Sequence, residues 1–193
     1  MLLLPIFLIL VGISAPSYGQ VKEKGEAFDL INLERHQFRF DLLSPGISYE
    51  LGLFKNQSIS TTLGLGLATY EPGYVIGLAM NNRYRYYYNS NRRIGKGKNV
   101  SGNSGNYLAA AQAIFFSQLR LTTNISGPED FNVGFYGLAQ GIQRTYAKGF
   151  NFNAELGLVY YQGDGVSSGY GPLIGCSFGW VATKRKSRKP KFE

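Results

Sequence analysis

The stretch SISTTLGLGLAT, residues 58–69, alternates between two kinds of side chain. Its odd positions are Ile59, two threonines and three leucines, whereas its even positions carry only Ser, Thr, Gly and Ala. Alternation with a period of two is typical of a β-strand, because successive side chains of a strand point to opposite faces of the sheet. The stretch therefore predicts a strand with one apolar face and one face of small residues.

Seven further segments alternate in the same way and are separated by turn residues such as Pro45 and Gly73. Eight strands joined as consecutive hairpins predict an all-β fold, a closed up-and-down antiparallel barrel over residues 36–182. Several segments hold 9 to 14 residues. A strand that crosses a bilayer needs about 9 to 11 residues, so the lengths favour a transmembrane barrel. The predicted strands are residues 37–43, 46–54, 58–69, 74–88, 106–117, 132–144, 150–162 and 170–182.

Six of these segments sort into two faces, whereas residues 106–117 and 132–144 do not sort. One face is large and apolar, and the other holds small residues and every charged residue of the six segments. Small residues suit the narrow interior of an eight-stranded barrel, and a cation on a lipid-facing surface costs about 2–4 kcal/mol at the midplane. We therefore predict that the apolar face points outward to lipid and that side chains fill the lumen, which leaves no pore.

Buried charges are very costly unless they are paired, and the charges on the predicted inner face balance. We expect them to form one interior network of arginines and carboxylates. Its members are Arg39, Asp41, Glu50, Arg83, Arg85 and Glu155.

The first residues, MLLLPIFLILVGISAPSYGQ, form an apolar run that ends in small residues, although no Lys or Arg precedes it. Ser17 and Gly19 stand three positions and one position before a cleavage point at Gln20, as in a secretory signal peptide. The run is shorter than the roughly 20 residues of a membrane-spanning helix. We expect a signal peptide over residues 1–19, cleaved near Gly19/Gln20, and a lead-in segment over residues 20–35.

The chain of 193 residues suits one domain, and its single cysteine rules out an internal disulfide. The formal net charge is +8, and the last ten residues, KRKSRKPKFE, hold six Lys or Arg and one Glu. Two interpretations of this basic tail, residues 183–193, stay open. It is either a solvated end or a segment that binds anionic material such as lipid headgroups or peptidoglycan.

Three segments, FDLLSPGISYELGL, the basic turn after RYRYYYN, and GIQRTYAKGFNFNAELGL, resemble small eight-stranded outer membrane β-barrel proteins of Gram-negative bacteria. The likeness is to the broad OmpA/OmpX-like class and covers about residues 36–182. It implies outer membrane localisation, contact with outer membrane lipid, and a monomer. GCSFGW resembles the signal read by the barrel-assembly machinery, with Gly175, Phe178 and Trp180 in the expected spacing. Leu173 departs from that signal, as do the eleven or so residues that follow it.

The resemblance also implies that both chain ends lie in the periplasm. An aromatic girdle would then lie near the periplasmic interface, as in other outer membrane barrels. Its members would be Tyr84, Tyr86, Tyr88, Tyr146 and Trp180.

The sequence predicts a non-enzymatic protein with a structural or surface-interaction role, and two alternatives stay open. The first is a secreted, soluble, lipocalin-like barrel that binds a small apolar ligand inside. The second is a lipid A-modifying barrel enzyme, which would depend on His36, the single histidine. No spacing suggests a metal or cofactor site, and nothing resembling a nucleic-acid recognition fold accompanies the basic charge.

Overall fold

The computed structural model describes residues 33–43, 45–70, 73–123, 132–163 and 166–183. The predicted signal peptide, most of the lead-in segment and nearly all of the basic tail lie outside the described residues. Within the described residues the fold consists of eight strands and two short helical segments. They are β1 (His36–Asp41), β2 (Gly46–Phe54), β3 (Gln57–Tyr70), β4 (Gly73–Tyr86), α2 (Ser90–Gly95), β5 (Gly105–Thr123), β6 (Asn132–Thr145), the 3₁₀ turn η1 (Ala147–Gly149), β7 (Phe150–Gly163) and β8 (Val166–Val181).

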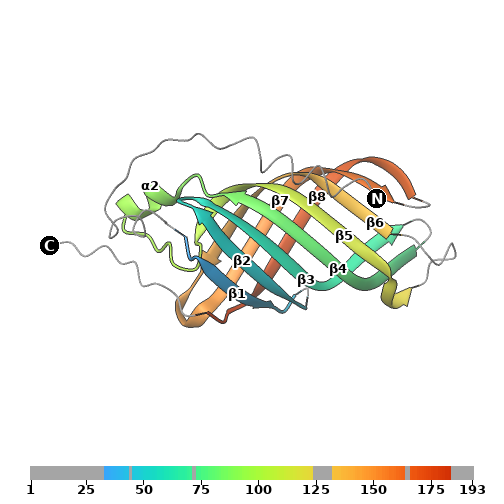
Figure 1. Ribbon diagram of the computed structural model, residues 1–193, viewed down its shortest axis with the longest axis horizontal. Coiled ribbons are helices and arrows are strands. Elements are labelled where there is room, and N and C mark those ends of the chain that lie inside the picture. Colours follow the sequence, from blue (N-terminus) through green and yellow to red (C-terminus); the bar gives the residue numbers. More distant parts are fainter. Residues whose placement is uncertain (1–32, 44, 71–72, 124–131, 164–165, 184–193) are drawn as a thin grey trace.

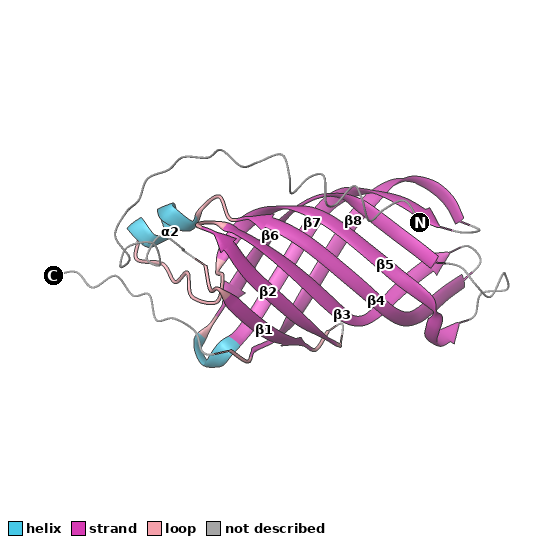
Figure 2. Cartoon of the chain, in the orientation of Figure 1, coloured by secondary structure: helices cyan, strands magenta, loops and turns pink. Residues whose placement is uncertain are grey.

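The strands form one closed sheet in which each strand pairs antiparallel with its neighbours in the chain (Figures 1 and 2). Pairing of β1 with β8, from Arg39 opposite Val181 to Asp41 opposite Gly179, closes the ring. The predicted all-β fold of eight antiparallel strands is confirmed. No helix in the described part of the chain has the length and apolar character needed to cross a membrane.

β5 and β8 extend several residues beyond their predicted ends. β5 continues to Thr123, through residues predicted to form a loop, and β8 begins at Val166 instead of residue 170. The register between β4 and β5 shifts near Gly77, where residues of β5 after Phe116 bulge out of the ladder. A bulge interrupts the period of two, which explains why the end of β5 was read as a loop. β1 ends at Asp41 and β4 at Tyr86, each two residues earlier than predicted.

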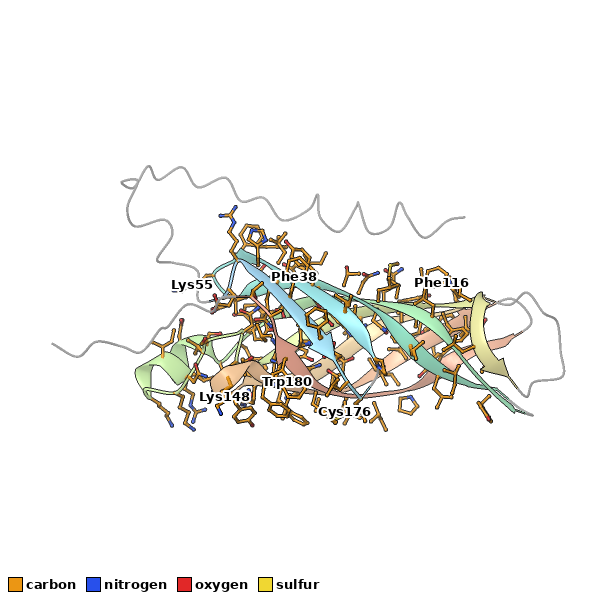
Figure 3. The ribbon with its side chains drawn as sticks, turned by 90° about the horizontal axis from the view of Figure 1, so that it is seen from below. Phe38, Lys55, Phe116, Lys148, Cys176 and Trp180 are labelled. Carbon is orange, nitrogen blue, oxygen red and sulfur yellow. The ribbon has the colours of Figure 1, made fainter. Side chains whose placement is uncertain are left out.

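The two faces of the ring sort as the alternation predicts. Large apolar residues such as Phe38, Leu63 and Leu158 are exposed on the outside, whereas Ser48 and Asn151 are buried inside. Figure 3 shows Phe38, Phe116, Cys176 and Trp180 pointing away from the ring. Strand β3, which holds the stretch analysed first, turns its leucines outward and its small residues inward.

The two strands that could not be sorted from sequence also have one inner face each. Most residues on these two inner faces are alanine or glycine, whose side chains extend little into the lumen. Aromatic rings occur only near the ends of these faces. In β5 the buried residues are Tyr107, Ala109, Ala111, Ala113 and Phe115, and in β6 they include Ala139 and Gln143.

Candidate functional site: an interior charge network and the cavity beside it

The structure places all six predicted interior charges inside the ring and brings them together as three ion pairs. We call these six residues the charge network. Each pair joins an arginine to a carboxylate, and all six side chains are at least nine-tenths buried. The pairs are Arg39 Nε with Asp41 Oδ1 at 2.8 Å, Arg83 Nη2 with Glu155 Oε1 at 2.6 Å, and Arg85 Nη1 with Glu50 Oε2 at 3.2 Å.

The Arg39 guanidinium uses all three of its nitrogens. Besides Asp41, it donates to Ser48 Oγ at 3.1 Å and to Asn151 Oδ1 at 3.4 Å. Ser48 in turn donates to the second oxygen of Asp41 at 2.5 Å. The pair therefore ties β1, β2 and β7 together from the inside.

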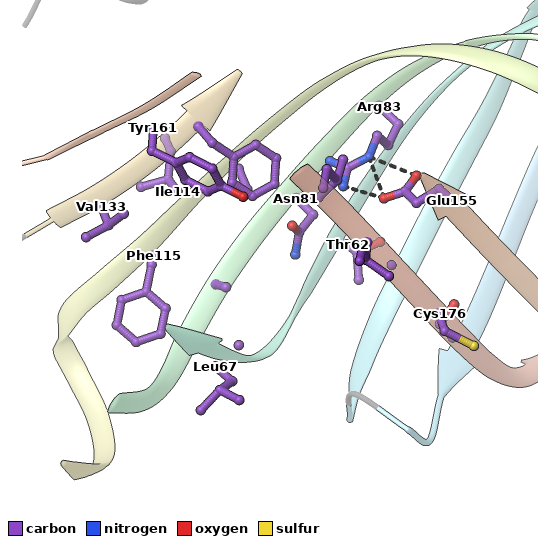
Figure 4. Close-up of a pocket in the computed structure, with 18 of the residues that line it drawn as sticks. Thr62, Leu67, Asn81, Arg83, Ile114, Phe115, Val133, Glu155, Tyr161 and Cys176 are labelled. Carbon is purple, nitrogen blue, oxygen red and sulfur yellow. Dashed lines mark hydrogen bonds and ion pairs between the residues drawn. The ribbon is translucent and has the colours of Figure 1, made fainter. Parts of the chain in front are cut away.

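The Arg83 guanidinium is also fully engaged. Its Nε lies 3.1 and 3.2 Å from the two Glu155 oxygens (Figure 4). Its Nη1 donates to the carbonyls of Asn82 and Gln112. The guanidinium carbon also lies 5.7 Å from the centre of the Phe135 ring. All three nitrogens therefore donate, and the paired Glu155 carboxylate balances the positive charge of this arginine.

Glu50 is the most heavily bonded carboxylate. It accepts from Arg85, from Ser58 Oγ at 2.6 Å and from Tyr87 Oη at 2.8 Å. Tyr87 is the first residue after β4, and its burial, together with the neighbouring Glu50 carboxylate, raises the pKa of its phenol well above the usual range. The phenol therefore keeps its proton and remains a donor to Glu50. Arg85 also lies 4.8 Å from the centre of the Tyr107 ring, which is fully buried.

The segment between β4 and β5, residues 87–104, folds against this end of the ring, and we call it the end loop. The carbonyl of Gly102 accepts from Thr145 Oγ1 at 2.7 Å and from Gln143 Nε2 at 3.3 Å. Asn103 is fully buried, and its Oδ1 accepts from the amide of Glu34 at 2.7 Å. The sequence predicted only a basic connection without periodicity here. Gly97 and the adjacent Gly102 and Asn103 all have positive φ, and Gly and Asn, the residue types that adopt it most readily, are the local sequence signal of this backbone path.

A cavity of about 840 Å³ lies beside the charge network. Arg39, Arg83 and Glu155 line it at one side, and Phe115 and Tyr161 are among its apolar walls (Figure 4). Side chains thus fill the lumen from the charge network to the end nearer α2. Toward the opposite end the lumen holds the cavity. The expectation of a filled lumen needs that correction. The sequence did not predict which arginine pairs with which carboxylate, and it did not predict the cavity.

The residues predicted to form the girdle lie on β4 and β8 or just after β4 and β6, and those of the assembly signal lie on β8. Tyr84, Tyr86, Tyr88, Tyr146 and Trp180 are all exposed on the outside. Trp180 packs edge-on against Phe150, with ring centres 5.9 Å apart, and Phe178 lies 6.4 Å from the same ring. Gly175 faces inward against Glu155, since an added Cβ would lie 2.8 Å from the Glu155 Cγ. Their roles in the membrane and in assembly remain predictions.

His36 lies on the outer face, and its Nδ1 is 2.6 Å from Tyr49 Oη. It is therefore separate from the cavity. Among the described residues, no group of three or more His, Cys, Asp or Glu side chains could hold a metal ion.

Comparisons of this chain with protein-family models, with curated proteins and with solved structures found no match. The functional argument therefore depends on the geometry of the ring, the charge network and the cavity.

Proposed function

We propose that this chain is an integral outer membrane β-barrel, closed to free diffusion by its charge network, with a structural or surface-interaction role and no enzymatic activity. The observation that carries the proposal is the polarity of its two faces. Of the charged side chains described within the strands, the six of the charge network point inward and only Arg144, at the end of β6, points outward.

The outer face has the character that hydrocarbon requires. Its exposed side chains include Leu138 and Leu158 in the middle of β6 and β7, and Leu138 is 72% exposed. Water would disfavour so much apolar surface by about 25 cal/mol per Å², whereas lipid accepts it. Contiguous exposed apolar surface of this extent is rare on soluble monomers. The same polarity argues against the soluble lipocalin-like alternative, which needs its apolar residues inside.

Strand length and closure also support the proposal. The six strands from β3 to β8 have 14 to 19 residues each, which is more than the about 9 to 11 that a tilted strand needs to cross a bilayer. Over the length where β1 and β2 complete the ring, backbone groups are satisfied by pairing strand with strand, as the hydrocarbon core requires.

Outer membrane lipid and the barrel-assembly machinery are the partners that this proposal implies. The basic tail, residues 183–193, would lie on the periplasmic side, where it would meet anionic headgroups or peptidoglycan. The chain would act as a monomer.

Nitroxide labels at single cysteines, in a Cys176→Ser background, test which medium the outer face meets. A label at Leu138 should collide with oxygen, which dissolves in lipid, and not with a water-soluble nickel chelate. A label at Lys55, exposed in the turn between β2 and β3, is the matched control and should collide with the chelate. Collision of the Leu138 label with the chelate would contradict the proposal and favour the soluble barrel.

A further inference from the structure

The ring is complete at one end only, because β1 and β2 are much shorter than the other strands. Pairing between β2 and β3 ends at Gly46 opposite Gly64, and pairing between β1 and β8 ends at Asp41 opposite Gly179. Beyond these points residues 66–70 of β3 and 166–177 of β8 pair on one side only, with β4 and β7. Within the described residues, two strand edges therefore face each other across the place that β1 and β2 leave vacant.

The cavity reaches this gap. On β4, β6 and β7 only alternate, inward-facing residues line it, and on β5, which is paired on both sides, the consecutive residues 113–115 do. The longest run of consecutive lining residues, 169–177, is on β8, and Leu65 to Leu67 line the cavity on β3. Consecutive residues of a strand point to opposite faces, and these two runs lie on the strands whose pairing ends at the gap, so the cavity reaches the two free edges there. Tyr170 and Ile174 of β8 are 79% and 78% exposed beside it.

The free edge of β8 is blocked against an added strand at its centre. Backbone bonds from Leu42 to Phe178 and from Ala182 to Phe38 show that even-numbered residues of β8 turn their backbone groups toward β1. Pro172 has the same parity, so its nitrogen, which carries no hydrogen, faces the gap. Its carbonyl accepts a hydrogen bond from Tyr161 Oη at 2.8 Å. Proline on an edge prevents further strand pairing, so the gap suits a small molecule better than an extended peptide.

The chemistry of the cavity indicates what that molecule is. Its walls include Phe115, Val133 and Leu173, which suit a hydrocarbon chain. The nearby arginines of the charge network are neutralised by carboxylates, so they do not select a charged group. Asn81 and Ser177 also line the cavity, and Asn81 appears beside the Arg83–Glu155 pair in Figure 4. An uncharged, hydrogen-bonding head group fits these surroundings, and the volume lies within the about 300–1,000 Å³ of small-molecule sites.

We propose that the gap between β3 and β8 is a lateral portal through which one uncharged, single-chain amphiphile passes between the bilayer and the cavity. This inference rests on the proposed function, since the portal opens to lipid only if the outer face is embedded. The molecule lies with its head group near Asn81 and its chain along Phe115, and leaves between Leu67 and Ile174.

Photolabelling tests the portal in the full chain reconstituted in phosphatidylcholine vesicles. The probe is a monoacylglycerol that carries a diazirine in its acyl chain, and phosphatidylcholine with the same chain is the comparison. Labelled residues are mapped by mass spectrometry. Both probes should label outward residues such as Leu138, and only the monoacylglycerol should label the inward residues Ala113 and Phe115, along which its chain lies.

Filling the cavity should abolish the inward labels alone. Ala79→Phe places a ring in the cavity, and Ala110→Phe, on the outer face of the neighbouring strand, is the matched control. Inward labelling should be lost in the first variant and kept in the second, with outward labelling unchanged in both. If Ala79→Phe does not fold, as judged by its migration on a gel before and after boiling, Val133→Phe serves the same purpose.

The outcomes separate the two proposals. Outward labels without inward labels would overturn the portal and leave the membrane barrel standing. Absence of outward labels would overturn the membrane barrel itself. Inward labelling by phosphatidylcholine would overturn the restriction to one chain, and a peptide crosslinked to β8 would assign the gap to strand addition and overturn the portal.

Discussion

The two ends of this barrel differ in how the interior is filled. Near α2, all eight strands pair, and three ion pairs and the end loop fill the ring. At the other end, six strands continue without β1 and β2, and the interior holds a cavity with two free strand edges. A filled interior and an accessible cavity are therefore separate properties of one sheet, and the length of β1 and β2 determines where each occurs.

The largest effect is expected at the closed end. Arg83→Leu would leave Glu155 buried without its partner and should lower the free energy of unfolding by about 3–5 kcal/mol, measured by urea titration in lipid vesicles. The double variant Arg83→Leu/Glu155→Leu is the control. It should recover most of the loss, because replacing both members of a buried pair by apolar residues is often close to neutral. Equal stability of Arg83→Leu and the unmodified protein would refute the proposed role of the network.

The outer face should respond next. Leu138→Lys should cost about 2–4 kcal/mol of stability if the residue lies near the bilayer midplane, whereas Tyr146→Lys, beyond the end of β6, should cost about 0–1 kcal/mol. The same urea titration measures both. A soluble barrel predicts a different result, since an exposed Leu→Lys change stays within about 0.5 kcal/mol.

The end loop offers a comparison between two glycines that share a positive φ. Gly102 has φ 61° and an added Cβ would lie 2.6 Å from Thr145 Oγ1, whereas Gly97 has φ 63° and nothing within 4 Å. Each change to alanine carries the backbone cost of about 1–3 kcal/mol, and Gly102→Ala adds the clash. Urea titration should therefore find Gly102→Ala clearly less stable than Gly97→Ala. Equal stabilities would mean that the end loop does not pack against the ring.

The smallest effect is expected at the open edge. Pro172→Ala should change stability by less than about 0.5 kcal/mol, because the nitrogen faces the gap and breaks no ladder bond. Leu158→Pro, in the fully paired strand β7 directly opposite Pro172, should cost about 1–3 kcal/mol for the lost bond. Similar losses in both variants would show that the β8 edge is paired and would remove the gap from the account.

Much of the architecture could be predicted because the sequence carries a period of two. The alternation of residues 58–69 gave the faces of β3, and the charges at Arg39, Glu50 and Arg83 gave the inner side of three strands. The partner of each charge could not be predicted, because Arg83 meets Glu155 across 72 positions of the chain, through a register that no local pattern encodes. The last residues of β5 could not be predicted either, because the bulge interrupts the period of two that identifies a strand.

One residue in the sequence does indicate a free strand edge beside the cavity. Pro172 stands within the segment YGPLIG, and proline inside a strand is found essentially at edges or bulges. Pro45 lies in the turn after β1 and limits the length of the first hairpin, which also indicates a partly unpaired edge. These two prolines together predict that β8 has a second neighbour for only part of its length.

Fractionation of the cells, together with migration on a gel, shows directly whether the barrel is embedded in the outer membrane. We expect the protein in the outer membrane fraction, with the unheated form migrating faster than the boiled form, because a closed barrel resists detergent. Recovery from the soluble periplasm or the medium, with no shift on boiling, would contradict it. The assignment of inside and outside would then have to be reconsidered in favour of a soluble barrel that holds its ligand within.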